Sequence, residues 1–164
     1  MKKLQTILFV AALLFIGSCS HSSNNSNVQA NAWQATINGQ AKSGNYVTCY
    51  YEVSGDKGLV IALYEGSTAS TTFIQLTLEG NAPADLTTGT FTLGSGVNDG
   101  GYIAGTTNYA STNGGSGSLV LTQFNLGTKK ISGTFNFTGK NLMNSSDVVT
   151  VTSGSFTNLS ITTI

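Results

Sequence analysis

The feature that most constrains the fold is how strand-forming runs alternate with turn residues after Asn31. Runs of β-branched and aromatic residues are separated by Gly, Asn, Asp and Ser, and no long stretch has helical periodicity. Between Lys130 and Thr138, apolar and polar residues alternate strictly, apart from one glycine. Such alternation is typical of an antiparallel strand with one face buried. Many short strands with frequent turns indicate an all-β domain.

The expected strands can be placed from these runs. They are Trp33 to Ile37, Tyr46 to Val53, Gly58 to Glu65, Thr72 to Leu78, Thr90 to Leu93, Tyr102 to Thr107, Ser118 to Leu126, Lys130 to Thr138, Val148 to Thr152 and Phe156 to Ile161. Asn38-Gly39 predicts a hairpin turn, because both residues tolerate positive φ. A change of phase at Ser153-Gly154-Ser155 predicts a β-bulge. We expect a single antiparallel β-sandwich of about eight to ten strands, with a closed β-barrel as the alternative.

The N-terminal segment differs from the rest of the chain. Lys2 and Lys3 precede an apolar stretch from Ile7 to Ile16, and small residues follow it. A basic start, a short apolar core and a small-residue junction are typical of a secretory signal peptide. The apolar stretch is shorter than the roughly 20 residues that a transmembrane helix needs. We therefore expect residues 1–18 to be a signal peptide.

The junction Ile16-Gly17-Ser18-Cys19 resembles the lipobox of bacterial lipoproteins. The resemblance implies cleavage before Cys19, a diacylglycerol on its sulfur and a third acyl chain, palmitate, on its new amino group. Residues 19–31 are then a lipidated, flexible tether, because they hold too little apolar surface to order themselves. Residues 32–164 form the folded domain. Three acyl chains would hold the protein on its membrane, at roughly 0.8 kcal/mol per buried methylene.

The same resemblance implies a location in the cell envelope. Ser20, which follows the cysteine, favours the outer membrane over the inner one. An acidic run that would mark surface export does not follow Cys19. Both the periplasmic face and the cell surface therefore stay open.

The net charge and the residue types of the domain exclude several classes of function. Loss of Lys2 and Lys3 leaves five lysines against seven acidic residues, a net charge of −2, so we expect no nucleic-acid partner. The only histidine is His21, in the tether, so the domain has no base for serine hydrolysis and no cluster for zinc. Cys49 lies in phase with Val47 and Tyr51, which favours a buried apolar role. We predict no catalytic residue, no metal site and no cofactor.

A carboxylate-dependent glycan hydrolase is the alternative function. Such an enzyme needs two carboxylates within about 10 Å. Glu52 and Glu65 lie at opposite ends of the expected hairpin, roughly 17 Å apart at 3.4 Å per residue. The sequence does not fix the distances between four other carboxylates, those of Glu79, Asp85, Asp99 and Asp147. If two of them faced each other across a cleft, the enzyme would be favoured.

Motifs at both ends of the domain carry a second resemblance. The opening Trp33-x-Ala35-x-Ile37-Asn38-Gly39 and the closing Gly133-Thr134-Phe135-x-Phe137 and Gly154-Ser155-Phe156-Thr157-Asn158-Leu159 are similar to a family of exported Gram-negative lipoproteins of unknown function. These motifs consist of turns, aromatics and a bulge. The resemblance therefore implies a fold rather than an activity.

We expect a non-enzymatic, membrane-anchored module that binds a ligand or partner, either a glycan or an envelope protein. Recognition in a sandwich usually falls on loops. The longest irregular stretch expected here runs from Gly94 to Gly117. Its candidate ligand-binding residues, which offer stacking and hydrogen bonds, are Asn98, Asp99, Tyr102, Asn108 and Tyr109.

Overall fold

A computed structural model describes residues 32–53, 58–79 and 86–164. The predicted signal peptide, Cys19 and the predicted tether lie outside these ranges. The described residues form strands and one short 3-10 helix, with no α-helix. The strands are β1 Trp33–Ile37, β2 Gln40–Gly44, β3 Val47–Tyr51, β4 Gly58–Tyr64, β5 Thr72–Glu79, β6 Gly89–Leu93, β7 Asp99–Ala104, β8 Thr107–Ala110, β9 Ser116–Asn125, β10 Lys130–Asn141, β11 Val148–Ser160 and β12 Thr162–Thr163; the 3-10 helix η1 spans Ser111–Asn113.

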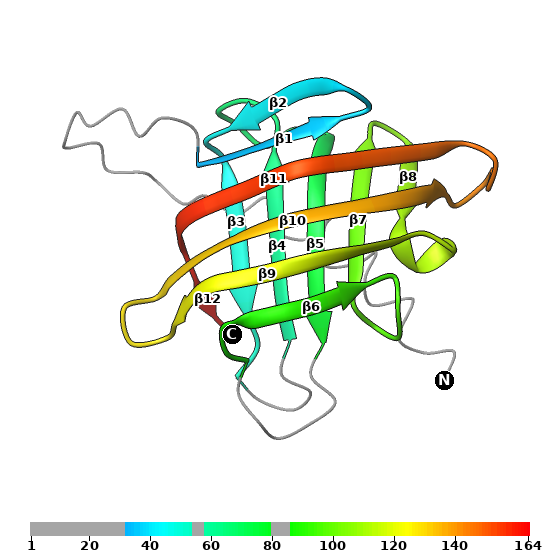
Figure 1. Cartoon of the computed structure of the whole chain (residues 1–164). Helices are drawn as coiled ribbons and strands as arrows, with labels where there is room; N and C mark the ends of the chain where they lie inside the picture. Colours follow the sequence, from blue (N-terminus) through cyan, green and yellow to red (C-terminus); the bar gives the residue numbers. More distant parts are fainter. Residues whose placement is uncertain (1–31, 54–57, 80–85) are drawn as a thin grey trace.

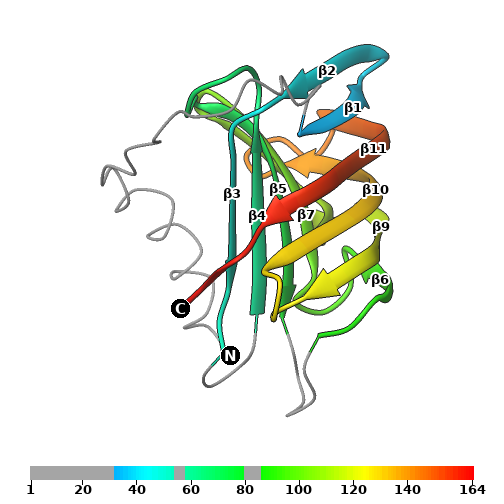
Figure 2. The same cartoon turned by 90° about the vertical axis from the view of Figure 1, so that its left-hand side faces the viewer.

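The strands form two layers that cross each other. One layer has the order β12-β3-β4-β5-β7-β8, and the other has the order β6-β9-β10-β11-β1-β2. Figures 1 and 2 show the second layer lying across the first. The layers join where β8 pairs with the end of β10, at Ala110 with Lys140 and Tyr109 with Asn141. The pairing continues from β12 to β2 without closing into a barrel. The predicted all-β sandwich is confirmed.

Three details of the predicted architecture were wrong. The described residues form twelve strands rather than eight to ten, and the sheet is mixed, because β12 pairs in parallel with β3. The stretch Gly94 to Gly117 is not an irregular loop. It contains β7, β8, η1 and the first residues of β9, and β7 and β8 form a hairpin around Gly105. Gly105 has φ +63°, which glycine adopts without strain.

The core lies between the two layers. In β10, Ile131, Phe135 and Phe137 are buried, while Thr134 and Asn136 are exposed, as the alternation predicted. Trp33, Tyr51, Phe137 and Phe156 are the largest side chains that are almost completely buried. The predicted bulge is also confirmed, since the register of β1 with β11 shifts between Gln34 and Thr36.

Paired glycines and phenylalanines explain the closing motifs. Gly133 lies opposite Phe156, and Phe135 lies opposite Gly154, on neighbouring strands. A Cβ on Gly154 would lie 2.4 Å from the Phe135 ring, and one on Gly133 would lie 2.8 Å from the Phe156 ring. The two rings stack with centroids 6.2 Å apart. Each glycine therefore makes room for the aromatic ring of the opposite strand.

The opening motif builds a corner between the layers. Trp33 is 1% exposed, and its Nε1 donates a 2.9 Å hydrogen bond to the Tyr64 carbonyl of the other layer. A Cβ on Gly44 would lie 2.1 Å from that same carbonyl. Asn38 has φ +48° and forms the predicted turn between β1 and β2. Its Oδ1 accepts a 2.8 Å hydrogen bond from the Thr150 backbone N–H.

Cys49 is buried, as its phase predicted, and burial raises the pKa of its thiol from 9.0 to about 12. The unfolded thiol ionises near pH 9 and the folded thiol near pH 12. The contribution of the neutral thiol to the free energy of unfolding is therefore fully present below pH 9. It falls by on the order of 4 kcal/mol as the pH rises from 9 to 12. We expect urea unfolding at pH 8 and pH 11 to show a larger alkaline loss in the natural chain than in Cys49→Ala. Equal losses would contradict this assignment.

Candidate functional site

The turn of the β10–β11 hairpin presents apolar side chains to solvent. Met143 is 96% exposed and Leu142 is 46% exposed. We call these two residues the apolar tip. Val148, the first residue of β11, is 44% exposed at the base of the same turn. Leu142, Met143 and Val148 are exposed at one turn, and grouped apolar surface marks an interaction site more often than scattered single residues do.

Hydrogen bonds hold this turn in one conformation. The Leu142 N–H donates to the Asn108 carbonyl at 2.9 Å, and the Asp147 N–H donates to the Asn144 carbonyl at 3.0 Å. The Met143 N–H donates to Asn141 Oδ1 at 2.9 Å. The Ser146 N–H donates to Asn144 Oδ1 at 3.3 Å. The backbone on both sides of the apolar tip is therefore fixed before any partner arrives.

The Asp147 carboxylate ties the turn to the neighbouring layer. Its Oδ2 accepts hydrogen bonds from the Tyr109 hydroxyl and from the Asn141 amide, each at 2.9 Å. Tyr109 belongs to β8, so the contact joins the hairpin to the β7–β8 hairpin. The Asn113 amide also donates to the Asn141 carbonyl at 3.2 Å. The turn thus rests on the joint between the two layers.

Tyr102 and Tyr109 form a stacked pair behind the turn. Their rings lie 6.2 Å apart and are 29° from parallel. The Tyr102 hydroxyl donates to Glu65 Oε1 at 3.3 Å, and Lys42 Nζ binds Glu65 Oε2 at 3.0 Å. Polar contacts at both ends and a ring stack in the middle therefore connect Lys42 on β2 to Asp147.

Both tyrosines stay protonated at ordinary pH. Burial, followed by the charge of Glu65, raises the pKa of Tyr102 to about 12. The hydrogen bond to Asp147 raises the pKa of Tyr109 above its usual value. The two hydroxyls are therefore permanent donors to the two carboxylates. Through its bond to Asp147, Tyr109 positions the turn, while Tyr102 holds Glu65.

The structure brings only some of the predicted ligand-binding residues together. Tyr102, Asn108 and Tyr109 lie beside the β10–β11 turn. Asn98 lies apart from them, where its Oδ1 accepts from the Glu79 N–H and its amide donates to the Thr92 carbonyl. Asp99 Oδ1 accepts from the Ser111 hydroxyl and the Thr112 N–H, which fixes η1. Asn98 and Asp99 thus have structural contacts of their own.

The carboxylates considered for hydrolysis have distinct environments. Asp99 and Asp147 are each held by the neutral donors described above. Glu52 follows β3 and Glu65 follows β4, at opposite ends of their hairpin, as predicted. Asp85 lies outside the described residues. Within the described ranges, no three His, Cys, Asp or Glu side chains group so that they could hold a metal ion.

The apolar tip was missed by reasoning from the sequence. Leu142 and Met143 lie between Asn141 and Asn144, and two adjacent apolar residues in an expected polar turn were the available signal. Their exposure depends on which way the turn projects, which the sequence pattern does not fix.

Comparison with known proteins identifies a family of unknown function. Among the described residues, no helix has both the length and the apolar character needed to cross a membrane. No curated protein and no solved structure matches the chain. The model of one family, the domain of unknown function DUF6252, matches residues 24–160. Since this match includes most of the chain, the protein belongs to the DUF6252 family.

Proposed function

We propose that the chain is a lipid-anchored protein of the bacterial outer membrane whose β-sandwich is a non-enzymatic binding module. It binds a protein partner through the apolar tip and the surface around it. The observation that carries this proposal is the near-complete exposure of Met143 on a turn whose backbone is already hydrogen-bonded.

The physical basis is preorganisation. Immobilising a flexible loop on binding costs conformational entropy, which weakens association. The turn between β10 and β11 is already largely ordered by hydrogen bonds of Asn141 and Asp147. Burying Leu142 and Met143 in a partner would then contribute apolar free energy with little ordering cost. A few such anchors usually dominate the affinity of a protein interface.

Neutral side chains surround most of the tip, and the one carboxylate described in the turn, that of Asp147, already accepts hydrogen bonds from Tyr109 and Asn141. Asn108, Asn113 and Asn144 lie at or beside the turn and are neutral hydrogen-bonding residues. An apolar centre with a polar rim is the usual anatomy of a protein–protein interface.

The position of the tip also favours a protein over the anchoring membrane. Trp33, where the predicted tether joins the domain, pairs with Phe156 of β11. The β10–β11 turn adjoins Val148, which is eight residues before Phe156 in β11, roughly 27 Å away at 3.4 Å per residue. In Figure 1, β1 begins at the left and the hairpin turns at the right. The predicted tether averages roughly 20 Å, so a tip roughly 27 Å from the point of attachment can stand away from the membrane surface.

The test is photocrosslinking in cells that make the full-length protein. Met143 is replaced by p-benzoylphenylalanine, and Thr128, which is exposed in the β9–β10 turn at the other end of these strands, is the matched control position. We expect a protein adduct of defined mass at position 143 and not at position 128. Purified partner should then bind Leu142→Ser, Met143→Ser at least ten-fold more weakly than the natural chain, with unchanged melting temperature.

Two results would contradict the proposal. Adducts only with lipid at position 143 would favour insertion of the tip into the membrane. Equal protein adducts at positions 143 and 128 would mean that the tip is not a specific surface.

The anchoring is tested separately. We expect the natural chain to partition into detergent and Cys19→Ala to remain uncleaved or become soluble. A Cys19→Ala chain that is processed and retained like the natural one would refute the lipid anchor while leaving the apolar tip untouched.

A further inference from the structure

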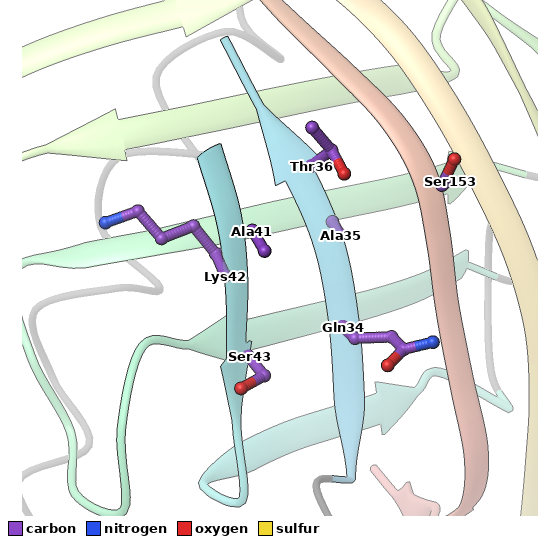
Figure 3. Close-up of a pocket in the computed structure, with 7 residues that line it drawn as sticks. All are labelled: Gln34, Ala35, Thr36, Ala41, Lys42, Ser43 and Ser153. Carbon is purple, nitrogen blue, oxygen red and sulfur yellow. The ribbon is translucent and has the colours of Figure 1, made fainter. Parts of the chain in front are cut away.

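The outer face of the second layer carries a hollow of about 410 Å³. Strands β1, β2 and β11 form it, and Figure 3 shows its lining. Its lining includes Gln34, Thr36, Ala41, Lys42, Ser43 and Ser153. Small-molecule sites usually measure about 300–1,000 Å³, so the hollow is large enough for a small ligand. It lies away from the apolar tip.

The β-bulge creates this concavity. Gln34 pairs with Ser155, whereas Thr36 pairs with Thr152, so β11 has an extra residue opposite β1. Bulges bend a strand and re-aim its side chains, and they often lie beside functional sites. Ser153 is one of the residues left without a partner in that register, and its side chain lines the hollow in Figure 3.

Serine at position 153 is not explained by the backbone. Its φ is +52°, in the left-handed region that glycine adopts without strain. A glycine at position 153 would adopt this φ without strain, yet the glycine of the bulge stands one residue later, at position 154. What serine adds at that position is a hydroxyl in the hollow.

The polar groups of the hollow are available to a ligand. Among the described contacts, no hydrogen bond involves the side chains of Gln34, Thr36, Ser43 or Ser153. Elsewhere on the same face such groups are paired within the protein: the Asn136 amide donates to Ser118 Oγ at 3.0 Å, and the Ser132 hydroxyl donates to Gln123 Oε1 at 2.9 Å.

The hollow is electrically neutral. Lys42 is its one charged lining residue, and the Lys42 ammonium lies 3.0 Å from a Glu65 carboxylate oxygen. An anionic ligand would therefore gain little from the lysine. A primary amide and three hydroxyls can both donate and accept hydrogen bonds, which suits a ligand rich in neutral hydroxyl groups.

We propose that this hollow binds a segment of a neutral oligosaccharide. The sugar hydroxyls exchange hydrogen bonds with the Gln34 amide and with the hydroxyls of Thr36, Ser43 and Ser153, and the Ala41 methyl group packs against the ring. The site is independent of the apolar tip, so an envelope protein and a glycan could be held at the same time.

The test is affinity electrophoresis of the mature chain in gels that contain dextran, laminarin or galactomannan, with alginate as the anionic comparison. We expect at least one neutral polysaccharide to retard the natural chain. Ser153→Gly and Gln34→Ala should each weaken that binding about five- to ten-fold, the loss expected for one hydrogen bond. The melting temperature of Ser153→Gly should be unchanged or higher, because the substitution relieves the backbone.

Asn158→Gly is the matched control. Asn158 has φ +53° on the same strand and does not line the hollow, so it should leave retardation unchanged. Leu142→Ser, Met143→Ser should also bind the polysaccharide normally, which separates this site from the proposed function. No retardation by any neutral polysaccharide, natural binding by Ser153→Gly, or stronger binding to alginate would each overturn the proposal.

Discussion

Replacing Trp33 by alanine should lower the free energy of unfolding by about 3–5 kcal/mol, the usual cost of removing a buried tryptophan. The indole is 1% exposed and fills the corner between β1 and the other layer. Its loss also leaves the Tyr64 carbonyl without the 2.9 Å hydrogen bond. Thermal denaturation should show a fall in Tm of about 10–20 °C.

Trp33→Phe separates the two parts of this effect. Phenylalanine keeps most of the apolar area but cannot donate a hydrogen bond, so its cost should be smaller, about 1–3 kcal/mol. If Trp33→Ala lost less than Trp33→Phe, or less than about 1 kcal/mol, the corner would not depend on the indole.

Replacing Gly154 by alanine is the second substitution with a large expected effect. The new Cβ would lie 2.4–2.6 Å from three atoms of the Phe135 ring. That ring is 2% exposed and is stacked on Phe156, so it has little room to move. Overpacking of a core usually costs about 1–3 kcal/mol and occasionally more, and we expect a value at or above the top of that range.

Gly127→Ala provides the comparison. Gly127 is exposed in the β9–β10 turn, its φ is not in the left-handed region, and a Cβ there would meet only Asn125 Oδ1 at 3.3 Å. Urea unfolding should therefore show Gly127→Ala within about 0.5 kcal/mol of the natural chain. Equal losses in Gly154→Ala and Gly127→Ala would contradict the packing of Phe135 over Gly154.

Much of the fold could be predicted because local patterns encode it. The alternation around Phe135 identified the buried face of β10, Asn38-Gly39 identified the first turn, and the change of phase located the bulge near Ser153. Strand β2 was missed because Gln40–Gly44 contains no large apolar residue. Pairing with β1 makes it a strand, and the sequence carries little local preference for one.

The candidate site was less predictable because its contacts are distant in sequence. Tyr102 and Tyr109 were recognised by residue type, but their carboxylate partners lie 37 and 38 residues away. The Tyr102 contact depends on the pairing of β4, β5 and β7, and the Tyr109 contact depends on the joint between β8 and β10; no local pattern encodes either. The role of Asp147 as an acceptor for Tyr109 follows only from that joint.

The apolar tip stands on a turn whose hydrogen bonds should keep it rigid without a partner. Backbone 15N relaxation of the mature chain measures this directly through the order parameters of Leu142 and Met143. We predict S² of about 0.85, the value of rigid backbone, and a decrease in Tyr109→Phe, which removes the hydrogen bond to Asp147. Values below about 0.6 for Leu142 and Met143 in the natural chain would show a flexible loop and would contradict the preorganisation of the apolar tip.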